Sequence, residues 1–143
     1  MILTFLLSFL LGLSQPIASE PASTIKLRIT NCSSNEGLVR VLVYNQAVGF
    51  PENTKTAVVS YSLPIKGKHA EISIPDLGPG EYAISAYHDE NEDGELEKHL
   101  LGYPTERYGF SNNPKITFSA PTYERCVFEI KENENKEVHI KLH

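Results

Sequence analysis

Six carboxylates gather within nine residues in the segment 89–97, DENEDGELE. Asp89, Asn91 and Asp93 stand at alternate positions, and Gly94 follows where a tight loop must turn sharply. Alternate residues of such a loop direct their oxygens at a common centre, which suits calcium, a hard cation that takes about six to eight oxygen ligands. The spacing therefore predicts a calcium-binding loop. The alternative is a solvated acidic turn that binds no specific ion.

Three glutamates would complete this loop. Glu95 would contribute its backbone carbonyl, and Glu97 occupies a position that often binds calcium through a water molecule. Leu100 stands where helix-flanked calcium loops have a bidentate glutamate, so we expect Glu106, in the same long loop, to supply the missing ligand. Magnesium suits the loop less well, since it prefers fewer protein ligands and retains water. The predicted calcium ligands are Asp89, Asn91, Asp93, Glu95, Glu97 and Glu106.

Aromatic residues follow the acidic segment at Tyr103, Tyr108 and Phe110, and Asn112 comes directly after them. In one interpretation the rings pack over one end of the domain and fasten the long loop. In the other, the rings form a shelf that stacks on a sugar, and the Asn112 amide supplies hydrogen bonds. The second interpretation would make the chain a carbohydrate-binding module.

Catalytic chemistry has less support in the sequence. His88 is favoured as a structural histidine that orients Asp89, because no other histidine stands at a close zinc-ligand spacing; His69 and His99 would be its partners in a zinc site. No G-x-S-x-G motif is present. A metal-dependent hydrolase, with an open coordination position near His88 and Glu106, is the enzymatic alternative. We expect a protein that is not an enzyme.

The elements that position these residues are strands, because apolar and polar side chains alternate along most of the chain. Residues 38–44, LVRVLVY, are apolar on both faces except at Arg40, which is typical of a central strand. The sequence predicts an all-β fold, a single antiparallel β-sandwich of roughly seven or eight short strands. The expected strands lie at or near residues 25–29, 38–44, 57–63, 70–74, 81–88, 116–118, 126–130 and 138–142.

The segment 77–82, LGPGEY, predicts a corner at which the chain changes sheets, with Leu77 in the core and Tyr82 at the start of the next strand. This pattern resembles that of prealbumin-like and immunoglobulin-like modules of secreted proteins. Between His88 and Lys115 lie 26 residues without clear strand periodicity, whereas an ordinary connection has about 4–6. We expect this long loop to be the functional segment.

The N-terminal segment has the composition of a secretory signal peptide. Residues 1–13 hold ten apolar side chains and no charged one, and small residues follow. Such a run is too short to span a bilayer comfortably as a helix. We expect residues 1–19 to be a signal peptide that is removed, and residues 24–143 to form the secreted or periplasmic domain, without a membrane span. An uncleaved membrane anchor is the alternative.

Export would place Cys32 and Cys126 in an oxidising compartment, where one intramolecular disulfide could join them. Strand alternation puts Cys126 on a core face with Phe128 and Ile130, but puts Cys32 on the outer face unless a bulge intervenes. Both a disulfide and two separate thiols therefore stay open.

The formal net charge of −5 argues against nucleic acid as a partner, because phosphate recognition needs a basic surface. The same charge argues against binding to an anionic membrane surface.

A longer motif carries a family resemblance. Residues 79–94 are PGEYAISAYHDENEDG, and residues 101–113 are LGYPTERYGFSNN. The pattern P-G-x-Y-A-I-x-x-x-H-D-x-N-x-[ND]-G, followed by G-x-P-x-E-x-Y-G-F-S-N, resembles the signature of an uncharacterised bacterial secreted family, a domain of unknown function. The resemblance covers about residues 24–143. It implies an exported β-sandwich in a Gram-negative bacterium and implies no activity.

These observations together predict an exported, non-catalytic β-sandwich that calcium stabilises in its 89–106 loop and that acts as a binding or envelope-associated module. Its partner would be a small molecule, a glycan or an envelope protein. The alternatives are a metal-dependent hydrolase that uses the acidic loop and a carbohydrate-binding module that uses the aromatic residues.

Overall fold

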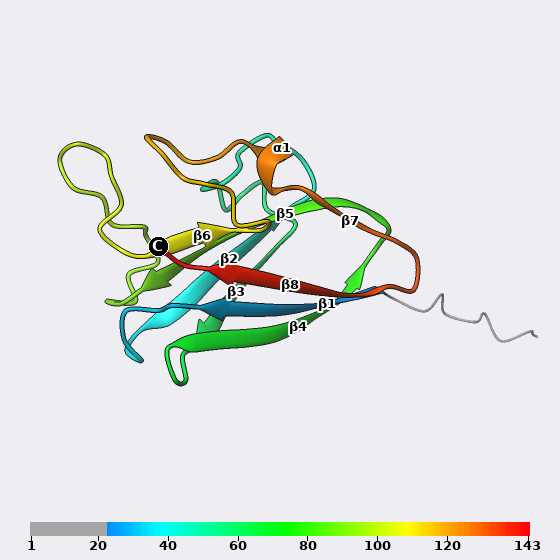
Figure 1. The fold of residues 1–143 in the computed structure, drawn as a ribbon, viewed down its shortest axis with the longest axis horizontal. Coiled ribbons are helices and arrows are strands. Elements are labelled where there is room, and N and C mark those ends of the chain that lie inside the picture. Colours follow the sequence, from blue (N-terminus) through cyan, green and yellow to red (C-terminus); the bar gives the residue numbers. More distant parts are fainter. Residues whose placement is uncertain (1–22) are drawn as a thin grey trace, which may run out of the picture.

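The computed structural model describes residues 23–143, which form two layers of β-strands with loops over one of them (Figure 1). The predicted signal peptide, residues 1–19, lies outside the described residues. The strands and the helix are β1 (Ser23–Thr30), β2 (Leu38–Tyr44), β3 (Val59–Pro64), β4 (His69–Leu77), β5 (Gly80–Asp89), β6 (Tyr108–Phe110), α1 (Tyr123–Cys126), β7 (Phe128–Ile130) and β8 (Asn135–Lys141).

One sheet has the strand order β4-β1-β8, and the other has the order β3-β2-β5-β6, with β7 also paired to β5. The predicted all-β sandwich is confirmed. One detail differs, because β1 and β8 pair in parallel, with Leu27 opposite Val138. The chain leaves the five-stranded sheet after β7 and enters the edge of the other sheet as β8, so the direction of β8 is not set by a hairpin to β1.

The core between the sheets follows the alternation read from the sequence. Ile25, Leu27 and Ile29 of β1 are at most 1% exposed, and Val39 and Val41 of β2 are fully buried. Alternate side chains of a strand point to opposite faces, so each of these runs presents one apolar face to the other sheet.

The predicted corner is confirmed. The turn at Gly78 carries the chain from β4 in one sheet to β5 in the other. Leu77 packs against the core, and the Tyr82 hydroxyl donates to the Gly78 carbonyl at 2.9 Å. This bond fastens the corner that directs β5 toward the acidic loop.

A second apolar cluster lies on the outer face of the five-stranded sheet. The Phe50 ring sits 5.3 Å from that of Tyr44 and 5.8 Å from that of Tyr123, both nearly perpendicular. The buried members are Ala83, Phe110 and Cys126, with Phe50, Tyr108, Ile116 and Tyr123 packed against them. The loop between β2 and β3 and the segment after β6 therefore cover part of this outer face.

One expected strand segment is wrong, and another, at residues 126–130, is shorter than expected and forms only at Phe128–Ile130. No strand forms near residues 116–118, where Phe118 is 88% exposed, because prolines at positions 114 and 121 bracket the segment. Cys126 ends the short helix α1 instead of standing on a strand, although it is fully buried.

The two cysteines are free and lie in different apolar clusters, so the disulfide is not formed. Cys32 is only 2% exposed, contrary to the outward position expected, because Asn31 adopts a positive φ of 70° and interrupts the alternation. Burial raises the pKa of the Cys32 thiol, and burial raises that of Cys126 to about 11. Both thiols are therefore poor nucleophiles.

Candidate functional site

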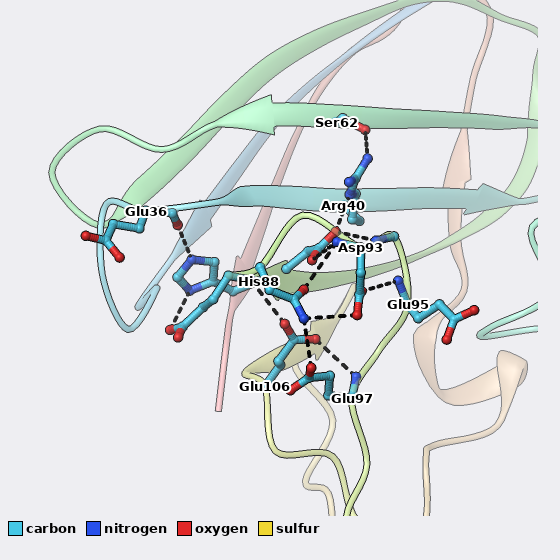
Figure 2. A network of polar contacts seen from close by, with 12 residues as sticks. Glu36, Arg40, Ser62, His88, Asp93, Glu95, Glu97 and Glu106 are labelled. Carbon is cyan, nitrogen blue, oxygen red and sulfur yellow. Dashed lines mark hydrogen bonds and ion pairs between the residues drawn. The ribbon is translucent and has the colours of Figure 1, made fainter.

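The acidic loop begins at Asp89, a fully buried carboxylate at the end of β5. Its Oδ2 accepts hydrogen bonds from Arg40 Nε at 2.7 Å and from the Gly94 N–H at 2.9 Å, and its Oδ1 accepts one from the Asp93 N–H at 3.2 Å (Figure 2). Burial raises the pKa of Asp89, but the hydrogen bonds from Arg40 and Gly94 and the charge of Arg40 outweigh it and hold the pKa below its usual range. Asp89 is therefore an ionised anchor.

Arg40 is the functional neighbour that the sequence interpretation missed. It lies on the outer face of β2 and also donates from Nη1 to Ser62 Oγ at 2.6 Å, so it links β3 to the acidic loop. The signal was visible, because Arg40 is the one charge in an otherwise apolar strand. A lone charge in such a strand indicates a partner close by.

Asn91 stands between two carboxylates of the loop. Its Nδ2 donates to Asp93 Oδ2 at 3.0 Å and to Glu97 Oε1 at 2.8 Å. Asp93 also accepts the Glu95 N–H at 2.8 Å, while the carboxylate of Glu95 points away from the network (Figure 2). The structure thus brings three predicted ligand side chains together and turns the Glu95 carboxylate outward.

Glu106 ties the two ends of the acidic loop together. Its Oε1 accepts the Glu90 N–H at 3.0 Å, and its Oε2 accepts the Glu97 N–H at 3.1 Å. Burial raises the pKa of Glu106; the two backbone bonds lower it, and the negative charges of Asp89 and Glu97 raise it again, so the pKa lies above its ordinary value. Glu106 therefore lies beside the network, and its role as a calcium ligand stays a prediction.

The oxygen donors of this loop have the chemistry that calcium prefers. Arg40 already neutralises Asp89, however, and the Asn91 amide already donates to two carboxylates. Within residues 23–143, no group of three or more His, Cys, Asp or Glu side chains is arranged to hold a metal ion. The loop as described is held by its own hydrogen bonds, and calcium at this position stays a prediction.

His88 is fully buried and contacts the 33–36 loop. Its Nδ1 accepts the Ser33 N–H at 3.2 Å. This leaves Nε2–H to donate to the Glu36 carbonyl at 2.7 Å (Figure 2). The predicted hydrogen bond from His88 to Asp89 is wrong, because consecutive residues of β5 point to opposite faces. His88 instead anchors the loop between β1 and β2.

A pocket of about 690 Å³ lies on the outer face of the five-stranded sheet, next to the acidic loop. This volume is typical of small-molecule sites, which measure about 300–1,000 Å³. Its walls come from residues 94–104 and 117–120. Its floor is made by the outward side chains of β2, β3 and β5, which are Arg40, Leu42, Ser60, Ser62, Ser85 and Tyr87.

The aromatic residues singled out in the sequence reach this pocket in different ways. Tyr103, Tyr108 and Phe110 line it, but Phe110 is only 4% exposed and meets Tyr108 at 76°, so the three rings form no flat shelf. Asn112 turns away and donates to the Val127 carbonyl at 2.7 Å. Of the three rings, Tyr103 is the most open to solvent, at 44% exposed.

The fold and the pocket define a two-sheet β-sandwich with a ligand-sized hollow on one outer face. The profile of a family described as an uncharacterized protein conserved in bacteria, DUF2141, matches residues 27–139, and the chain belongs to that family. The predicted family resemblance is thereby confirmed. No curated protein and no solved structure matches the chain. In residues 23–143, no helix has the length and apolar character needed to cross a membrane.

Proposed function

We propose that this chain is an exported, non-catalytic binding module whose ligand occupies the pocket on the outer face of the five-stranded sheet. The observation that carries the proposal is the pocket itself, about 690 Å³ in volume and lined by aromatic and hydroxyl side chains. Pockets of this size and lining are the usual binding sites of small molecules.

A binding role is favoured over hydrolysis by the state of the two groups that a hydrolase would use. His88 is fully buried with both ring nitrogens hydrogen-bonded, and Glu106 accepts a backbone N–H on each oxygen. A general acid or base must reach the proton that it transfers, within about 3 Å or through one water molecule. Both groups are engaged in holding loops.

Calcium is the proposed stabiliser of the pocket wall. Asp93 and Glu97 meet at the Asn91 amide, and Glu106 lies beside them, so these four side chains are the available oxygen donors. Calcium would replace the N–H donors of the Asn91 amide between the carboxylates of Asp93 and Glu97. Its affinity would fall near 10⁻⁴–10⁻³ M, roughly the range of extracellular modules.

Export is proposed from the sequence of residues 1–19, in which the apolar, uncharged run 1–13 is followed by a segment of mostly small residues. It would place the domain in the periplasm or outside the cell.

Binding in the pocket is tested with N-phenyl-1-naphthylamine, an uncharged aromatic probe whose fluorescence rises in an apolar site. We expect saturable binding that the pocket-filling Ser60→Trp variant removes. Ser73→Trp, on the exposed face of β4 in the other sheet, is the matched control and should bind the probe normally. Equal binding by Ser60→Trp would contradict a ligand site here, and so would the absence of saturable binding both of this probe and of other uncharged ligands.

The calcium part has its own test. We expect the unfolding midpoint to rise saturably with calcium after EDTA treatment, because a ligand that binds only the folded state stabilises it. Asp93→Ala should abolish the rise, and Glu92→Gln, an exposed acidic neighbour outside the network, should retain it. If the unfolding midpoint does not change at several millimolar calcium, the calcium proposal is wrong and the loop is a solvated acidic turn.

A further inference from the structure

We propose that the ligand of this pocket is a neutral saccharide, an inference that rests on the proposed binding function and names its ligand class. It is argued from three properties of the pocket lining: phenol hydroxyls without a protein partner, charges that are mostly paired, and rings exposed at the mouth.

Six of the seven tyrosines divide into two groups, and the seventh, Tyr61, packs against the core although it also borders the pocket. Three that hold loops and corners each donate a hydroxyl to a backbone carbonyl; these are Tyr44, Tyr82 and Tyr123. Tyr87, Tyr103 and Tyr108 line the pocket, and within residues 23–143 no hydrogen bond joins their hydroxyls to the protein. Tyr87 and Tyr108 are direct cross-strand neighbours on β5 and β6. The pocket therefore presents phenol hydroxyls that are open to hydrogen bonds with a ligand.

Three of the four charged side chains that line the pocket, Arg40, Glu52 and Lys98, are in ion pairs, and Glu95 has none within residues 23–143. Arg40 bonds to Asp89, and Lys98 contacts both oxygens of Glu52 at 2.7 and 2.8 Å. An anionic ligand would have to draw Arg40 or Lys98 away from its carboxylate, and a cationic ligand would find one unpaired carboxylate, that of the exposed Glu95. The lining therefore favours an uncharged ligand.

An apolar ligand fits this lining less well than a sugar. Covering Tyr87 and the partner-free hydroxyl of Ser60 with hydrocarbon would remove them from water without replacing the lost hydrogen bonds, which is unfavourable. A saccharide offers hydroxyls to these groups and an apolar C–H face to the rings. Exposed rings stand at the mouth to receive that face, since Tyr103 is 44% and Phe118 is 88% exposed.

The test uses calorimetric titration of the whole exported chain with three neutral trisaccharides (maltotriose, cellotriose and chitotriose in its N-acetylated form) and one anionic trisaccharide, trigalacturonate. We expect saturable binding of at least one neutral trisaccharide and weaker binding of trigalacturonate. Tyr87→Phe keeps the ring and removes the hydroxyl, so it should weaken that binding about tenfold. Tyr123→Phe, whose hydroxyl bonds to Glu81 away from the pocket, is the matched control and should bind normally.

The outcomes separate this inference from the proposed function. If the naphthylamine probe binds in the pocket and no neutral trisaccharide binds at millimolar concentration, the saccharide class is wrong and the binding function stands. Tighter binding of trigalacturonate, or unchanged trisaccharide binding in Tyr87→Phe, would also overturn the inference. If neither the probe nor any sugar binds, both proposals fail.

Discussion

The ion pair of Arg40 and Asp89 should be the principal polar support of the pocket floor, and replacing one partner tests this. Asp89 is fully buried and Arg40 has 24% of its side chain exposed. Arg40→Met would leave a buried carboxylate held only by backbone N–H groups. Asp89→Ala would leave a guanidinium that still reaches solvent and Ser62.

The expected losses in the free energy of unfolding follow from this difference in burial between Asp89 and Arg40. Removing one partner of a buried pair costs about 3–5 kcal/mol in the free energy of unfolding, so we expect Arg40→Met to fall in that range. Asp89→Ala should cost less, about 2–3 kcal/mol, because Arg40 remains partly solvated. The double variant should lose at least about 2 kcal/mol less than the sum of the single losses, since neither charge is then left alone.

Urea unfolding of the four proteins in EDTA measures this cycle without any contribution from calcium. The exposed pair Arg28–Glu71, with side chains 48% and 55% exposed, is the matched control. Arg28→Met should cost no more than about 1 kcal/mol. Because the folded-state pKa of Asp89 is lowered, its stabilisation is complete above the ordinary value of 3.8 and is lost as the pH falls through the lower folded-state pKa.

A cycle that is additive within about 0.5 kcal/mol would refute the reasoning, since it would mean that Arg40 and Asp89 contribute independently. So would a loss for Arg40→Met as small as that for Arg28→Met. Either result would assign the stability of the floor to the apolar cluster instead.

Three further predictions concern the surroundings of the site. Gly37→Ala should lower the free energy of unfolding by at least about 2 kcal/mol, because φ is +72° and the added methyl group meets the backbone at the end of β5. Gly78 has open space around it, so the control variant Gly78→Ala should unfold in urea like the parent protein. Glu106 has a raised folded-state pKa, so its carboxyl group binds more protons in the folded state than in the unfolded state. The contribution of Glu106 to the free energy of unfolding therefore falls as the pH rises from the ordinary 4.5 through the folded-state pKa. Glu106→Gln should remove that fall when unfolding is measured at a series of pH values, and an unchanged dependence on pH would contradict the prediction. Cys32 and Cys126 should react with a thiol reagent only at the rate of unfolding, and rapid labelling of the native chain would show that one of them is accessible.

Much of the fold could be predicted because its signals are local. The alternation in β1, the doubly apolar run of β2 and the corner before Tyr82 each appear within a few residues. The parallel pairing of β8 could not be predicted, because a period of two residues carries no information about strand direction. The helix α1, with four residues, is too short to give a periodic signal, and it turned Cys126 from an expected strand position into a helix end.

The site was predicted only in part, because only some of its contacts are local in the sequence. The acidic segment and Glu106 belong to one loop, so their proximity could be inferred from the chain. Arg40 and its partner Asp89 lie 49 residues apart, and only the pairing of β2 with β5 brings them together. The serines of the pocket floor look like ordinary outward residues of strands until the loops that surround them are placed.

The parallel pair of β1 and β8 also bears on how the chain folds. Thr24 is opposite Asn135, so the central strand of the three-stranded sheet lacks one neighbour until almost the whole domain has been synthesised. Structures with such distant contacts fold slowly, because the long loop must close before its contacts stabilise it. If the chain is exported as proposed, this delay would leave time for it to cross the membrane unfolded, since the sandwich cannot close before its last strand has been made.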